Sequence, residues 1–185
     1  LISSPPSGVV SVSQELYLEQ ANQTPPSLML HSGDAAQLST LLPLISEQGY
    51  RTLTYEEYYQ SLLHGETNDN AVLISIDDLG TYYLQPAFRE MVEQMTARGM
   101  RGTLAVVTRS TTEQQNDEIW KYLTELTHQG WELAIHTDDH VYLPEMSDTE
   151  LRRQIEAPYN LIKDRTGKAP ITLILPYGGI KDSSG

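Results

Sequence analysis

Cysteine is absent from the 185-residue chain, which excludes both a disulfide framework and a metal site built on thiolates. Basic residues are also scarce, with 12 Lys and Arg against 25 Asp and Glu and a formal net charge of −13. A nucleic-acid-binding protein needs a basic surface, so we expect no nucleic-acid partner. An anionic membrane surface is disfavoured for the same reason.

Long apolar runs are missing as well. No stretch is long enough to cross a bilayer, and no signal peptide is visible, so we expect no membrane span within this chain. The chain begins at Leu1 and not at Met, which is compatible with the removal of an upstream leader or anchor.

The chain divides into a short arm and one main domain. Residues 1–26 contain two Pro-Pro pairs and few apolar residues in register, which is typical of a linker or a peripheral arm. In residues 27–185, strand-like apolar segments alternate with segments of helical periodicity, and this alternation predicts an α/β fold with a parallel sheet, open or closed into a barrel. The expected strands, about six in number, are residues 28–31, 51–54, 71–80, 103–108, 131–135 and 171–175.

Two helix starts carry the pattern of a capping box, in which a Ser or Thr side chain and a Glu three residues later bond each other's backbone N–H groups. Thr54 and Glu57 form one such pair, and Ser147 and Glu150 form the other. Both pairs predict that a helix begins directly after the hydroxyl residue.

The segment 71–80 is the expected central strand, because five of its first six residues are apolar, as in strands buried on both faces. It ends in two adjacent carboxylates, Asp77 and Asp78, followed by Gly80. In α/β folds, catalytic and ligand-binding residues usually lie at the carboxyl ends of the parallel strands. The side chains of adjacent acids point in different directions. One of them can therefore bind a cation while the other handles a proton, although an Asp here can also simply cap the next helix.

Two histidines four residues apart, His136 and His140, follow the expected strand 131–135. A single turn brings imidazoles at this spacing to one side. Two imidazoles and one carboxylate form a common open ligand set for zinc or a similar divalent ion, and Asp78 would supply the carboxylate. The alternative is a pair of surface histidines in an acidic loop.

A third motif, Pro176-Tyr177-Gly178, follows the last expected strand. The acid pair, the histidine pair and this turn all come directly after strands, so we expect them to share one rim of the sheet. Together and in this order they resemble the polysaccharide deacetylases of carbohydrate esterase family four, the NodB-homology fold. The resemblance covers about residues 27–179 and assigns 27–185 as the catalytic domain.

The motifs match the family unequally. The family's Asp-Asp-Gly is matched by Asp77 and Asp78, with Gly80 displaced by an inserted Leu79. Its His-Ser/Thr-x-x-His is matched in full by residues 136–140, and its Pro-Tyr-Gly by residues 176–178. The histidine motif is the only one of the three that is specific in itself.

The resemblance implies an incomplete (β/α) barrel with a groove over its carboxyl rim, and a role for each motif residue. Asp77 is the expected general base, and Asp78, His136 and His140 are the expected ligands of a divalent cation, with zinc the expected ion. The backbone N–H of Tyr177 is expected to stabilise the oxyanion. The implied reaction is hydrolysis of N-acetyl groups on an N-acetylglucosamine-containing polysaccharide, and the implied location is outside the cytoplasm or in the cell envelope.

Two departures from the family bear on this assignment. Family members often carry an arginine two residues before the Pro-Tyr, where this chain has Ile174; the subgroup resembling biofilm poly-N-acetylglucosamine deacetylases lacks it too. The family's catalytic histidine usually follows the third motif, but in circularly permuted members its strand comes first. Residues 28–31, Leu-Met-Leu-His, fit that strand, so His31 is the candidate general acid, the alternative being a histidine bonded to local backbone.

Two rival functions remain open at this point. The sequence His-Thr-Asp-Asp at residues 136–139 distantly resembles zinc amidases with a His-Pro-Asp-Asp signature, but Thr137 stands where proline is needed. The other rival is a deacetylase-like domain that binds glycan without turnover, favoured by Ile174, Leu79 and the short segment after the third motif. The sequence identifies neither the glycan nor the oligomeric state.

Overall fold

The structure is a computed structural model that describes residues 24–80, 85–109 and 116–178. The arm expected over residues 1–26 therefore lies almost wholly outside the described residues. No helix among the described residues is long and apolar enough to pass through a bilayer.

A parallel sheet forms the centre of the fold, as the alternation of segments predicted. Its main path has the order β1-β3-β4-β5, and β2 pairs with the beginning of β3. All pairings are parallel. The strands are β1 (Ser27–His31), β2 (Arg51–Leu53), β3 (Ala71–Leu79), β4 (Thr103–Val106) and β5 (Glu132–Ile135).

The sixth expected strand, residues 171–175, is present only as an extended segment beside β5. Leu173 forms an isolated parallel bridge with Ile135, whose N–H donates to Thr172 and whose carbonyl accepts from Ile174. Pro170 and Pro176 bound the segment, and because proline lacks a backbone N–H the ladder does not extend past them. The prediction of a full strand was wrong, but the segment does run parallel to its neighbour in the sheet, β5.

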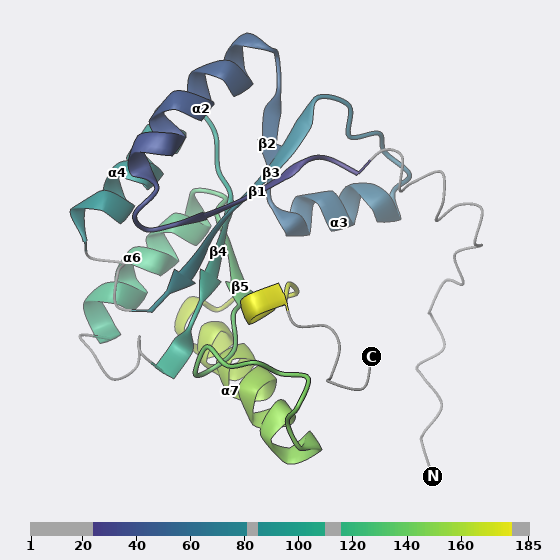
Figure 1. Cartoon of the computed structure of the whole chain (residues 1–185), viewed down its shortest axis with the longest axis vertical. Coiled ribbons are helices and arrows are strands. Elements are labelled where there is room, and N and C mark those ends of the chain that lie inside the picture. Colours follow the sequence, from purple (N-terminus) through teal and green to yellow (C-terminus); the bar gives the residue numbers. More distant parts are fainter. Residues whose placement is uncertain (1–23, 81–84, 110–115, 179–185) are drawn as a thin grey trace.

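Helices cover the sheet on both sides. Figure 1 shows α2, α4 and α6 together along one side and α3 on the opposite side. The helices are α2 (Ala35–Glu47), α3 (Tyr55–Leu63), α4 (Pro86–Thr96), α6 (Asn116–His128) and α7 (Asp148–Thr166). The result is the α/β arrangement expected for a NodB-type barrel that is open among the described residues.

Strand β3 divides its side chains between two apolar clusters. Ile74 and Ile76 belong to the main core, which also includes Phe88 and Met91 of α4, whereas Leu73 belongs to a small second cluster with residues of β2 and α3. Alternation along the strand then places Asp77 on the same face as Leu73. The rim of this second face is where the candidate site lies.

Strand β1 is mostly exposed. Only Leu30 of its five residues is buried, and Met29 is 61% exposed. The strand lies at the end of the sheet order, so one of its edges has no neighbouring strand among the described residues. Its apolar composition indicated a strand but not its place in the sheet.

The two predicted capping boxes differ in outcome. Thr54 and Glu57 bond reciprocally at the start of α3, as predicted. At the start of α7, Ser147 accepts the N–H of Glu150, but the Glu150 carboxylate accepts from Arg153 and Gln154 instead of closing the box. The charge-assisted hydrogen bond from Arg153 is stronger than a bond to the neutral N–H of the cap residue, so Glu150 bonds Arg153.

Candidate metal centre

The two adjacent carboxylates lie on a β-bulge at the end of β3. Ile76 pairs with Leu104 and Leu79 with Val106, so three steps along β3 correspond to two along β4. Asp78, inside this irregularity, has a left-handed backbone with φ of 58°. Bulges redirect side chains next to functional sites, and here Asp77 is only 3% exposed whereas the Asp78 side chain is 43% exposed.

The two histidines come from the turn that follows β5. The backbone N–H of His136 still donates to Val106 of β4, so the backbone of this residue is fixed to the sheet. Thr137 and His140 both have positive φ, 65° and 55°, and the tight turn brings the two imidazole centroids to 5.0 Å. The sequence spacing of four is thus realised in a turn and not on a helix.

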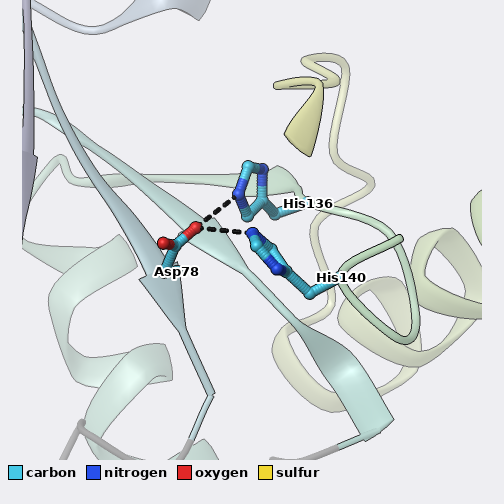
Figure 2. Close-up of side chains that lie close together, drawn as sticks. All are labelled: Asp78, His136 and His140. Atoms are coloured by element: carbon cyan, nitrogen blue, oxygen red, sulfur yellow. Dashed lines mark hydrogen bonds and ion pairs between the residues drawn. The ribbon is translucent and has the colours of Figure 1, made fainter. Parts of the chain in front are cut away.

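Asp78, His136 and His140 converge on one point (Figure 2). Asp78 Oδ1 lies 2.9 Å from His136 Nε2 and 2.7 Å from His140 Nε2. Burial opposes ionisation of Asp78, but the His136 hydrogen bond and the nearby imidazoles outweigh it and lower the pKa of the carboxyl. The structure therefore brings together the three residues that the sequence nominated as ligands.

The other ring nitrogens are already engaged. His136 Nδ1 lies 2.8 Å from the carbonyl oxygen of Ile174, which can only accept, so Nδ1 carries the proton. In a neutral His136 ring, Nε2 then presents a lone pair toward a carboxylate oxygen, a repulsive contact unless a proton or a cation lies between them. His140 Nδ1 has the Tyr177 hydroxyl as its partner at 3.1 Å.

This donor set fits a divalent cation. Two imidazole nitrogens and one carboxylate oxygen are a ligand combination that zinc accepts, with a position left for water or substrate. Hydrogen bonds at Nδ1, such as that of His136 to the Ile174 carbonyl and that between His140 and the Tyr177 hydroxyl, are the usual means of orienting a ligating histidine. These three residues could therefore hold one metal ion.

Asp77 lies behind these ligands and is almost fully buried. Its Oδ1 atom has no hydrogen-bond partner among the described residues. Burial is the main cause of a raised pKa for this carboxyl; the neighbouring Asp78 charge adds to the rise, while a hydrogen bond from Ser75 and the charge of His136 oppose it. Asp77 is thus a buried acid with a spare oxygen beside the cation site.

His31 is brought to the same rim from β1. Its Cα is paired in register with that of Asp77, and its Nε2 lies 3.4 Å from Asp78 Oδ2. On its other side, Nδ1 lies 3.6 Å from Asp34, whose carboxylate also accepts the His31 backbone N–H at 2.7 Å. The side chain is 47% exposed, so it faces both the ligands and solvent.

Tyr177 closes the rim on the side of His140. Its backbone is left-handed, with φ of 60°, and its ring centroid lies 4.8 Å from that of His140. The side chain is 71% exposed. It therefore presents an aromatic surface to solvent directly beside the histidine turn.

Backbone strain is concentrated at this site. Of the five non-glycine residues recorded with positive φ, only Asn70 lies elsewhere; the other four are Asp78, Thr137, His140 and Tyr177. Left-handed backbone costs about 1–3 kcal/mol per such residue and persists where the surrounding structure enforces it. These positions could not be predicted from the sequence, because glycine is the residue that usually indicates a left-handed backbone and none of the four is a glycine.

Comparison with known proteins agrees with this geometry. A family model described as polysaccharide deacetylase matches residues 64–184, more than half of the chain, and the match includes every motif residue except His31. No curated protein gives a significant match.

Several solved structures share the fold. The deacetylase PplD of Streptococcus pyogenes, solved with acetate, superposes with a TM-score of 0.71 at 19% identity, covering 85% of this chain and 76% of that one. A putative polysaccharide deacetylase of Bacillus anthracis and a polysaccharide deacetylase of Bacillus cereus each give 0.68, at 16% and 15% identity, over 85% of this chain and 52% of theirs.

The chain thus spans about half the length of the two Bacillus proteins. At these identities the superpositions establish the fold, and the family model establishes the kinship that the three motifs predicted. The chain belongs to the polysaccharide deacetylase family, carbohydrate esterase family four with the NodB-homology fold.

Proposed function

We propose that the protein is a metal-dependent deacetylase that removes N-acetyl groups from an N-acetylglucosamine-containing polysaccharide, with Asp78, His136 and His140 holding one divalent cation, zinc. The observation that carries the proposal is the pair of bonds on His136. Its Nδ1 proton is committed to a backbone carbonyl, so a cation relieves the contact between Nε2 and Asp78. The same proposal places the reaction outside the cytoplasm, where such polysaccharides occur.

When bound, the cation would polarise the acetamide carbonyl and make a water more acidic. Asp77, with a free oxygen beside the ligands, takes a proton from the attacking water. His31 then donates a proton to the nitrogen of the leaving amine as the C–N bond breaks. Acetate and a free amino sugar result, and the backbone N–H of Tyr177 stabilises the negative charge that develops on the carbonyl oxygen.

Features of the chain around the ligands support this division of roles. The raised pKa of Asp77 is that of a carboxylate which accepts a proton more readily than an exposed one. His31 lies between Asp34 and Asp78, so its ring is at the rim beside the proposed ligands, within reach of a substrate bound there. The exposed ring of Tyr177 offers an apolar face of the kind that stacks on sugars.

The proposal is tested by following acetate release from N-acetylglucosamine oligomers. Protein stripped with a chelator should release no acetate above background, and one equivalent of zinc should restore the activity, because the carbonyl needs the cation for polarisation. Stripped and reloaded samples that release acetate equally would refute metal dependence. Reloaded protein that binds the oligomers without releasing acetate would support the rival reading of a glycan-binding domain.

The role of His31 gives a second prediction. We expect His31→Ala to keep stoichiometric zinc but to lose about 10²-fold in acetate release, the lower end of the range for a general acid, since a half-exposed site admits water as a substitute donor. Added imidazole should restore part of the rate, because the vacated position is open to solvent. His64→Ala, an exposed histidine at the end of α3, is the matched control, and equal rates in the two variants would rule His31 out.

A further inference from the structure

The turn that carries the two histidines has a backbone that a polar loop does not adopt unaided. Thr137 and His140 have φ of 65° and 55°, and the left-handed region is especially unfavourable for a β-branched residue such as threonine. Such a conformation persists only where surrounding contacts enforce it. The contacts of the two intervening residues, Asp138 and Asp139, therefore indicate what holds the histidines in place.

Gln154 of α7 supplies the first set of contacts. Its side chain is fully buried, and its Oε1 accepts the backbone N–H groups of both Asp138 and Asp139 at 3.0 Å. Its Nε2 donates to Asp139 Oδ2 at 2.9 Å and to Glu150 Oε1 at 3.1 Å. One buried amide thus joins the backbone of the turn to helix α7, and a fully bonded buried network of this kind is rigid.

Two arginines supply the second set. Arg153 of α7 donates to Asp138 Oδ2 at 2.7 Å and also to Asp139, and Arg109, shortly after β4, bonds the same two carboxylates. Partial burial opposes ionisation of Asp139, but the bonds from Arg153 and Gln154 outweigh it and lower its pKa. Both carboxylates are thus engaged in ion pairs, which keeps the acids nearest the histidines out of the ligand set.

From these contacts we infer that Gln154 and Arg153 are positioning residues: they hold residues 137–140 in the conformation that aims the Nε2 atoms of His136 and His140 at Asp78. In the described part of the chain, their recorded bonds go to the turn and to Glu150, not to the ligand atoms. The inference rests on the proposed function and deepens it. Loss of such outer contacts typically weakens metal binding about 10–100-fold.

The test is a Co²⁺ titration of the chelator-stripped protein, because cobalt reports coordination geometry through its visible spectrum. Arg153→Met and Gln154→Met should bind cobalt about 10–100-fold more weakly than wild type, with an altered spectrum at saturation. Arg152→Met is the matched control, because Arg152 precedes Arg153 on the same helix but pairs with Glu156 and is 74% exposed. Arg153→Lys keeps the charge without the forked geometry and should fall between wild type and Arg153→Met.

Wild-type affinity and an unchanged spectrum in both methionine variants would overturn the inference and leave the metal centre standing. A wild-type protein that binds no cobalt would instead overturn the proposed function. Circular dichroism of the stripped proteins checks folding. If the buried Gln154→Met fails to fold, Arg153→Met decides the question alone, because the Arg153 side chain is 35% exposed.

Discussion

His140→Ala is expected to lose its bound cation and to release acetate no faster than metal-stripped wild type. Catalytic zinc sites are usually held by three protein ligands, and this change leaves one imidazole and one carboxylate. Asp138 and Asp139, the acids nearest the lost imidazole, are not free to replace it, because Arg153 and Gln154 engage them. Zinc content per chain, measured after chelator washing and reloading, should fall from one equivalent to near zero.

His128→Ala is the control for this experiment, because His128 lies in the last turn of α6 and is not among the converging ligands. It should retain full zinc and full activity. A His140→Ala protein with one tightly held equivalent of zinc would show that the cation lies elsewhere or that His140 is not a ligand.

Asp77→Asn should give the second large effect. This variant should keep its zinc, because the converging ligands do not include Asp77, but acetate release should fall by about 10²–10⁴-fold, the usual contribution of a general base. Asparagine fills the same buried space without accepting a proton from water. Asp164→Asn, an exposed acid on α7, should leave both quantities unchanged, and loss of zinc in Asp77→Asn would mean that the two acids do not divide the work as proposed.

The same variant should be more stable than wild type when no metal is present. Burial raises the pKa of Asp77 in the folded protein, so its contribution favours folding below the unfolded value, near 3.8, and is lost as the pH rises through the folded value. At pH 7 the ionised carboxylate therefore opposes folding of the metal-free protein, and asparagine removes that opposition. Thermal unfolding of the stripped proteins should show a higher midpoint for Asp77→Asn at pH 7, and no advantage below pH 4 would be expected.

Much of the fold was predictable because local patterns and the final structure agree. The apolar run over 71–76 gave the central strand correctly, and the alternation of strand-like and helical segments gave the parallel sheet with its helices. The convergence of Asp78, His136 and His140 was predictable too, because parallel strands bring their carboxyl ends to one edge.

What escaped prediction depends on pairing between distant segments. The bulge that separates Asp77 from Asp78 arises from the register of β3 against β4, which no single strand encodes. His136 Nδ1 bonds the backbone carbonyl of Ile174. Every residue has a backbone carbonyl, so the type of residue 174 gives no indication of this contact. The contacts of Gln154 with the histidine turn span 15 and 16 residues, and an interior helical glutamine gives no sign of them.

The junction between Asp78 and His136 joins residues that are 58 positions apart, in a chain that has no cysteine. A cation held there would act as a cross-link between β3 and the end of β5. Because the cation would bind the folded chain and not the unfolded chain, its binding would raise the free energy of unfolding, by about 2.7 kcal/mol at a free metal concentration 100-fold above Kd. Metal supply would then govern both turnover and lifetime: a chain that loses its zinc would stop releasing acetate at once, and it would also become easier to unfold and to degrade.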